Sequence, residues 1–252
     1  MHALLPTVIE AGELARSYFR NVTAERKADS TLVTAADRAV EEFLTPRVSA
    51  LLPNARILGE EYGATGARDA EYTLTLDPID GTAAFISGLP TWCITVGLIR
   101  GTTAVGGITY LPMTGETYVA DGAVAEWNGR SIVRSGGAVP NEGDLFMLTH
   151  SDYHRGAAKR FPGKIRSLGS TAYHMALVAR GAAVAAVLGR PRLWDLAAGA
   201  ALLAATGGEI RYRSGAPMDV GALLQGERAP DHIVAAVPGM IDEILGLVGP
   251  PA

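Results

Sequence analysis

The segment Leu76-Asp77-Pro78-Ile79-Asp80-Gly81-Thr82 constrains the fold of this chain more than any other stretch. Before it, apolar and hydroxyl side chains alternate over residues 72–76, which is the period of a half-buried β-strand. Pro78 cannot donate to a strand ladder, so we expect the chain to turn there and to bring Asp80 beside Asp77. Two carboxylates in one small volume repel each other unless a proton or a cation lies between them, and Mg2+ prefers such oxygen ligands. The segment therefore predicts a metal site where the strand ends.

An ordinary turn explains the same residues, because Asp, Pro and Gly are common turn formers. Three other acidic positions have a similar setting. Glu60 follows a strand-like run over 55–58, Asp195 opens an apolar run that reaches Leu203, and Asp37 lies near the start of an expected helix. Acids at turns and at helix N-termini also cap free backbone amides, so each has a structural explanation. From these residues alone, capping acids in solvated turns and a metal site both remain open.

Together these segments resemble the inositol monophosphatase superfamily of Mg2+-dependent, Li+-sensitive phosphomonoesterases. That family carries a Gly-Glu-Glu turn, then Asp-Pro-Ile/Leu-Asp-Gly-Thr followed by Phe, and later Trp-Asp before a helix of small residues. The chain has all three in this order, at Gly59-Glu60-Glu61, at 77–85 and at Trp194-Asp195. Further stretches that agree are 27–41, 123–129, 166–170 and 205–208.

The resemblance implies an α+β, layered α/β fold, the α-β-α-β-α sandwich of inositol monophosphatases and fructose-1,6-bisphosphatases. It implies hydrolysis of a small-molecule phosphate monoester by a metal-activated water, with two to three Mg2+ ions per site and inhibition by Li+. The implied metal ligands are Glu60, Asp77, the carbonyl of Ile79, Asp80 and Asp195. The implied catalytic residues are Thr82, Asp37 and Glu60, with the Thr82 hydroxyl hydrogen-bonded to Asp37. The implied substrate-binding residues are Ile79, Asp80, Gly81, Thr82, Gly169, Ser170, Thr171 and Asp195.

The substrate stays open at this stage. Inositol monophosphatases hold sugar hydroxyls with a glutamate before Trp-Asp, and the matching residue here is Leu188, which cannot accept those hydrogen bonds. Arg190 and Arg192 add positive charge nearby, which suits a second anionic group but is also typical of surface residues, and Lys27 falls in the family's mobile lysine loop. The run 80–92 is similar to histidinol-phosphate phosphatases. The alternatives are a histidinol-phosphate or 3′-phosphoadenosine 5′-phosphate type of phosphatase, or a regulatory protein that binds metal on this fold without catalysis.

Composition narrows the class of protein. A chain of 252 residues with 48% hydrophobic side chains can bury a large core, and a net charge of -4 argues against a broad nucleic-acid surface. The lone Cys93 lies in an apolar run, so we expect a buried thiol in a reducing compartment. No signal peptide or membrane span is recognisable, so we expect a cytoplasmic enzyme that acts on a small phosphorylated metabolite. The resemblance also implies that the enzyme is a homodimer.

Hydrophobic periodicity predicts helices over about 4–20 and 34–52, followed by a strand-rich region from Tyr72 to about Val133. Strands and helices then alternate: strands near 145–149, 183–188 and 233–237, and helices over about 170–180 and from Asp195. The densest turn region, 135–143, is the expected seam between two halves of a single domain, 1–252.

Overall fold

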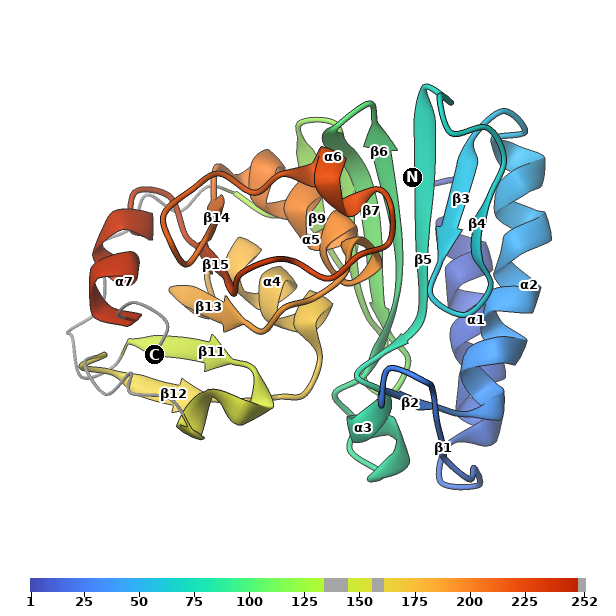
Figure 1. The fold of residues 1–252 in the computed structure, drawn as a ribbon, viewed down its shortest axis with the longest axis horizontal. Helices are drawn as coiled ribbons and strands as arrows, with labels where there is room; N and C mark the ends of the chain where they lie inside the picture. Colours follow the sequence, from blue (N-terminus) through green and yellow to red (C-terminus); the bar gives the residue numbers. More distant parts are fainter. Residues whose placement is uncertain (134–144, 156–160, 249–252) are drawn as a thin grey trace.

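Two β-sheets and three layers of helices alternate through the molecule, as Figure 1 shows. The computed structural model describes residues 1–133, 145–155 and 161–248. Helices α1 (Leu5–Tyr18) and α2 (Ala35–Leu51) cover the outer face of the large sheet. Helices α4 (Thr171–Ala179) and α5 (Leu193–Thr206) lie between the two sheets, and α7 (Ile241–Val248) covers the outer face of the small one. The predicted α-β-α-β-α sandwich is confirmed, whereas the predicted seam at 135–143 lies outside the described residues.

The large sheet has eight strands in the order β10-β9-β8-β7-β6-β5-β3-β4. Its neighbours pair antiparallel except for β3 and β5, which run parallel. The strand-rich region that the sequence predicts therefore forms one continuous meander from β5 to β10. The strands are β3 (Arg56–Gly59), β4 (Gly63–Thr65), β5 (Tyr72–Asp80), β6 (Cys93–Arg100), β7 (Thr103–Leu111), β8 (Glu116–Asp121), β9 (Val124–Trp127) and β10 (Arg130–Ser131).

Strand β5 differs from its prediction in two ways. The expected half-buried strand is wrong, because Thr73 and Thr75 are only 6% and 0% exposed. Helix α2 packs on one face of β5 and α5 on the other, so both sets of alternating side chains are buried. The strand also continues past Pro78 to Asp80, with its register against β6 shifted between Asp77 and Asp80. The register shift, in place of a full turn, brings the two carboxylates together.

The small sheet has five strands in the order β12-β11-β13-β15-β14. Its predicted strands and the helix α4 are confirmed to within two residues at each end, but the helix expected from Asp195 begins at Leu193. The strands are β11 (Phe146–Thr149), β12 (Lys164–Arg166), β13 (Ala185–Leu188), β14 (Glu209–Tyr212) and β15 (Ile233–Ala236). The short elements are the pair β1 (Glu25–Arg26) and β2 (Leu32–Val33), α3 (Thr82–Ile86), η2 (Ser151–Arg155) and α6 (Val220–Leu223).

Helix α5 lies unusually close to the large sheet. A Cβ atom at Gly107 of β7 would lie 2.4 Å from Ala198 Cα, and one at Gly97 of β6 would lie 2.4 Å from Ala197 Cβ. Only glycine fits at these two positions, because real Cβ atoms do not approach other atoms so closely. The sheet thereby fixes the position of α5, and with it the position of Asp195 in the first turn of that helix. Within the described ranges, no helix is long and apolar enough to cross a membrane.

Candidate active site

Three carboxylates from two distant segments meet at the end of β5. Asp77 and Asp80 come from the irregular end of the strand, and Asp195 comes from the first turn of α5. Each offers an oxygen, and these oxygens all lie within 4.8 Å of one another. Asp77 and Asp80 are only 1% and 6% exposed. The structure therefore brings together three of the acids that the sequence singled out.

Asp80 is held by the loop that leads into α4. Its Oδ2 accepts hydrogen bonds from Ser170 Oγ and from the Ala172 amide, both at 2.6 Å, and its Oδ1 accepts one from the Thr171 amide at 3.2 Å. Ser170 also caps α4, because its Oγ accepts from the Tyr173 amide. Ser170 and Thr171, which the resemblance implies at the substrate, thus hold and orient a carboxylate of the site.

The other two acids are fixed by nearby backbone. Asp77 Oδ1 accepts from the Ile79 amide at 3.0 Å. Asp195 is the third residue of α5, and its Oδ2 accepts from the Arg192 amide at 2.7 Å, so it caps the start of the helix from within its first turn. A single hydrogen bond does not satisfy a carboxylate, so each of these two acids keeps a second oxygen for another partner.

Burial raises the pKa of all three acids. Desolvation, and then the charges of Glu60 and of its partner acids, raises the pKa of Asp77 well above its usual range. Desolvation together with the nearby carboxylates raises the pKa of Asp195 to about 7. Desolvation raises that of Asp80 to about 6, although Ser170 and two backbone amides oppose the shift. Among the described residues no Lys or Arg forms an ion pair with these three carboxylates, so no side-chain cation neutralises them directly. This donor set, all hard oxygen, fits Mg2+.

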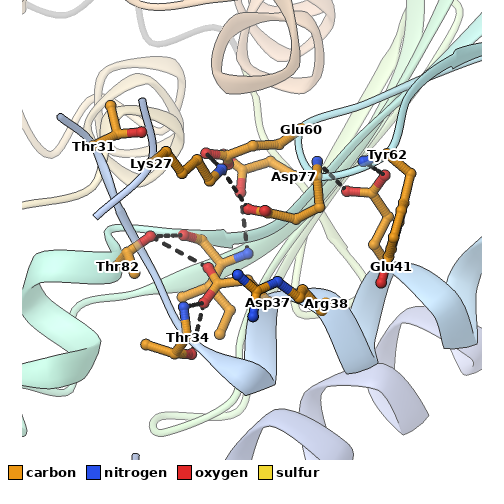
Figure 2. A network of polar contacts seen from close by, with 12 residues as sticks. Lys27, Thr31, Thr34, Asp37, Arg38, Glu41, Glu60, Tyr62, Asp77 and Thr82 are labelled. Atoms are coloured by element: carbon orange, nitrogen blue, oxygen red, sulfur yellow. Dashed lines mark hydrogen bonds and ion pairs between the residues drawn. The ribbon is translucent and has the colours of Figure 1, made fainter. Parts of the chain in front are cut away.

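Glu60 lies beside this group without belonging to it, and Figure 2 shows it facing Lys27. Lys27 Nζ donates to Glu60 Oε1 at 3.0 Å and to Glu61 Oε1 at 2.6 Å. Burial raises the pKa of Glu61 to about 7, and the Lys27 ammonium opposes that shift. The lysine of the β1–β2 loop is therefore bound to the Gly-Glu-Glu turn in this structure.

Thr82 and Asp37 meet next to the acids (Figure 2). Thr82 Oγ1 lies 3.4 Å from Asp37 Oδ1 and 3.1 Å from the carbonyl oxygen of Ile79. The other Asp37 oxygen accepts from the amide and the hydroxyl of Thr34, at 2.8 and 2.6 Å, so Asp37 completes the cap of α2. Burial raises the pKa of Asp37. The capping role and the contact with Thr82 therefore coexist in one side chain.

A cleft of about 560 Å³ opens over these groups. The predicted residues that line it are Glu60, Asp77, Ile79, Asp80, Gly81, Thr82, Gly169 and Asp195. Asp37, Ser170 and Thr171 are not part of the lining and act from behind it. The cleft is also lined by cations from three segments of the chain: Arg26, Lys27, Arg192 and Arg228.

Residues 2–237 match the model of the inositol monophosphatase family. The chain belongs to this family. Inositol-1-monophosphatase ImpA of Mycolicibacterium smegmatis is 30% identical over 98% of this chain and 92% of the relative. A histidinol-phosphatase of Chlorobaculum parvum is 33% identical over 79% and 80%. The 3′(2′),5′-bisphosphate nucleotidase CysQ of Aggregatibacter actinomycetemcomitans is 33% identical over 82% and 83%. Among solved structures, the IMPase of Thermotoga maritima superposes with a TM-score of 0.83 at 25% identity, covering 98% of this chain and 97% of that one.

Membership in the inositol monophosphatase family makes the chain a phosphoric monoester hydrolase, and the family is Mg2+-dependent. The oxygen ligands at the end of β5 agree with that metal. The substrate is not fixed by membership, because the three relatives are named for three different phosphate esters.

Sequence analysis assigned no role to Glu41, a buried residue of α2. Its two oxygens accept hydrogen bonds from the Glu61 amide at 2.8 Å and the Tyr62 amide at 3.1 Å, as Figure 2 shows. A Cβ at Gly59 would collide with this carboxylate, at 1.9 Å from its Oε1. Glu41 therefore fixes the turn that presents Glu60. An acid on the buried face of a helix was the signal that could have revealed it.

Cys93 and Leu188 bear on two further expectations. Cys93 is fully buried as predicted, and its Sγ lies 3.3 Å from Ser170 Oγ. Burial raises the pKa of the Cys93 thiol well above its usual value, so it stays protonated. Leu188 is 1% exposed at the end of β13 and does not line the cleft. The cleft thus lacks an acceptor for sugar hydroxyls at that position.

Proposed function

We propose that this chain hydrolyses a small-molecule phosphate monoester with Mg2+ held by Glu60, Asp77, the Ile79 carbonyl, Asp80 and Asp195. The observation that carries this proposal is the group of three buried carboxylate oxygens within 4.8 Å, on the wall of an open cleft. Buried acids that have raised pKa values and no ion-pair partner are costly in a purely structural role.

The reaction needs charge neutralisation, because a phosphate monoester is a dianion that water attacks slowly. Bound Mg2+ supplies positive charge for the phosphate and the leaving oxygen and lowers the pKa of water. The chain contributes the rigid placement of the acids: Ser170 and two amides fix Asp80, and α5 fixes Asp195 against the sheet. Fixed geometry removes the cost of reorganisation during reaction.

Thr82 and Asp37 are the groups placed to move a proton. In our proposal the Thr82 hydroxyl passes its proton to Asp37 Oδ1 as its free lone pair takes up a proton from the attacking water, so Thr82 stays neutral and Asp37 becomes protonated. The water oxygen forms a bond to phosphorus, the ester P–O bond breaks, and the departing alkoxide takes up a proton from solvent. Burial raises the pKa of Asp37, which makes that carboxylate a better proton acceptor.

The substrate is a small phosphorylated metabolite. The relatives named above act on an inositol monophosphate, on histidinol phosphate or on a nucleoside bisphosphate, as their names state. Leu188 disfavours strict selectivity for a neutral polyol, because no carboxylate replaces the glutamate at that position.

The test is phosphate release with Mg2+, with EDTA and with added Li+ from a panel of inositol 1-phosphate, histidinol phosphate, 3′-phosphoadenosine 5′-phosphate, fructose 1,6-bisphosphate, NADP and an aryl phosphate. Mg2+-dependent turnover that EDTA abolishes supports the proposal. Inactivity on the whole panel, in a folded protein that binds Mg2+, supports the second candidate, a regulatory protein that binds metal without catalysis.

The family resemblance adds two to three Mg2+ ions per site, inhibition by Li+ and a homodimer to this proposal, and the composition and expected elements add a single domain and a cytoplasmic location. Titration calorimetry with Mg2+ counts the ions, and sedimentation equilibrium gives the oligomeric state.

A further inference from the structure

Part of the cleft lining is basic. Arg26, Arg192 and Arg228 lie in this part, together with the acid Asp29. Arg26 ends β1, Asp29 lies in the β1–β2 loop, Arg192 is the N-cap of α5 and Arg228 follows α6, so the cluster joins both halves of the molecule. Two of these guanidinium groups, those of Arg192 and Arg228, thus face one carboxylate in a phosphatase cleft.

The carboxylate of Asp29 occupies the space between two of these arginines. Its Oδ2 lies 3.1 Å from Arg192 Nη2 and 3.5 Å from Arg228 Nη2. Its Oδ1 accepts from the Thr31 amide at 3.1 Å and from the Thr31 hydroxyl at 2.6 Å. The arrangement is that of an anion between paired guanidinium groups, supplied by the protein itself.

Both arginines have further partners that do not involve Asp29. Arg192 donates through Nη1 to the Gly226 carbonyl, and its guanidinium lies 5.5 Å from the centre of a Trp194 ring. Arg228 donates through Nη1 to the Arg190 carbonyl at 3.3 Å. The two guanidinium groups therefore stay in place when Asp29 moves away with its loop.

Asp29 is easily displaced by a stronger anion. Its side chain is 36% exposed, and exposed ion pairs contribute only about 0–1 kcal/mol. A phosphate dianion carries more charge and offers more oxygens to two guanidinium forks than a carboxylate does. An ammonium group would meet repulsion from Arg192 and Arg228 and gain one carboxylate, so this position disfavours amines.

We propose that Arg192 and Arg228 bind a second phosphate group of the substrate, in the position that the Asp29 carboxylate occupies here. This inference rests on the proposed function and narrows its substrate class to small metabolites with two phosphate groups. One phosphate reaches the acids and is hydrolysed, and the other stays on the arginines. Displacement of Asp29 releases the β1–β2 loop from the C-terminal half of the chain.

The test compares substrates that differ only in the second phosphate: 3′-phosphoadenosine 5′-phosphate against adenosine 3′-phosphate, and fructose 1,6-bisphosphate against fructose 1-phosphate. The wild type should prefer the bisphosphate of at least one pair by roughly 10-fold or more in kcat/KM, the range of a charged hydrogen-bonded contact. Arg228→Gln should lower kcat/KM for that bisphosphate about 10-fold more than for its monophosphate, mainly through KM. The matched control is Arg130→Gln, an exposed arginine on β10 outside the cleft.

Asp29→Asn gives an effect of opposite sign, which keeps the test decisive if an arginine variant fails to fold. Removing the internal competitor should lower KM for the bisphosphate. Equal kcat/KM within both pairs, equal losses within a pair for Arg228→Gln, or a preference for histidinol phosphate over both bisphosphates would overturn the inference.

Binding without turnover separates this inference from the proposed function. In EDTA, titration calorimetry of adenosine 5′-phosphate and of fructose 6-phosphate measures the arginines alone, because each keeps only the second phosphate. At least one should bind the wild type more tightly than Arg228→Gln. If neither binds, the subsite is wrong even where the enzyme is active. If one binds in an enzyme without Mg2+-dependent turnover, the subsite stands and the proposed reaction fails.

Discussion

The two ends of the cleft are built in opposite ways. At one end, Asp77 and Asp80 are almost completely buried and are fixed by amides and a hydroxyl from β5 and from the start of α4. At the other end, Asp29, Arg192 and Arg228 are between 24% and 43% exposed and come from loops or helix ends. Buried groups on packed elements suit one fixed chemistry, whereas exposed groups on loops can change without disturbing the core. The difference teaches that reaction and substrate choice are carried by separate parts of this cleft.

The largest expected effect is that of Asp80→Asn, which tests whether the buried acids carry the reaction. The change keeps the size of the side chain but removes a charge where phosphate and metal must be bound. We expect kcat/KM to fall by about 1000-fold, because such charge stabilisation is worth several kcal/mol. Phosphate release and Mg2+ titration would measure it. The control is Asp69→Asn, an exposed aspartate outside the cleft, and a loss of similar size there would disprove the assignment.

A smaller effect is expected at Thr82. Thr82→Ala removes the hydroxyl next to Asp37 and should lower kcat about 100-fold with little change in KM, the lower range for proton transfer by a side chain. Thr82→Ser keeps the hydroxyl and should retain most of the activity. A large loss in both variants would mean that Thr82 acts through its methyl group and the packing of α3.

Glu41→Gln tests a residue that holds the turn carrying Glu60 and is not itself a proposed metal ligand. The glutamine can donate but holds only one strong acceptor for the Glu61 and Tyr62 amides, so the turn that carries Glu60 should loosen. We expect Mg2+ affinity to weaken about 10-fold, as for other changes behind a metal ligand. Titration of activity against Mg2+ measures this change. A variant with unaltered Mg2+ dependence and lower thermal stability would show a purely structural role.

The smallest effect is a pH dependence of the folding stability that comes from the buried acids Asp80 and Asp195. The folded-state pKa values of Asp80 and Asp195 are raised to about 6 and about 7. Their stabilising contribution is therefore complete below the pKa of the unfolded chain and is lost as pH rises through these values. In EDTA we expect stability to fall by on the order of 1–3 kcal/mol between pH 4 and pH 8 from these groups. Mg2+ should remove that loss.

His174 contributes a pH dependence of opposite sign, and its contribution must be subtracted from the measured stability. Burial lowers its pKa to about 4, and its Nε2 accepts a hydrogen bond from the Leu168 amide, so the neutral ring is favoured in the fold. Its contribution is lost as pH falls from about 6.5 to about 4. The difference between melting temperatures with and without Mg2+ cancels this term. If that difference does not grow with pH, the acids are not the groups that bind Mg2+.

The sequence predicted what depends on local order. Asp77 and Asp80 lie three residues apart in one motif, and the periodic helices and strands follow from neighbours along the chain. The meeting of distant acids, and of Thr82 with Asp37, came only from the family resemblance, and other contacts between distant residues were not predicted. Ser170 meets Asp80 across 90 positions, and Arg192 meets Asp29 across 163. The burial of both faces of β5 was missed for the same reason, since it depends on which helices cover the finished sheet.

Helix α5 adds one consequence to its tight packing on Gly97 and Gly107. Because those glycines are in close contact with α5, the sheet sets the distance between Asp195 and Asp77. Gly107→Ala, in the middle of a strand and outside the cleft lining, would push the helix outward and widen the cage of carboxylates. Tolerance for cations of different radius would then be tuned from the core of the protein, without any change to a side chain that touches the ion.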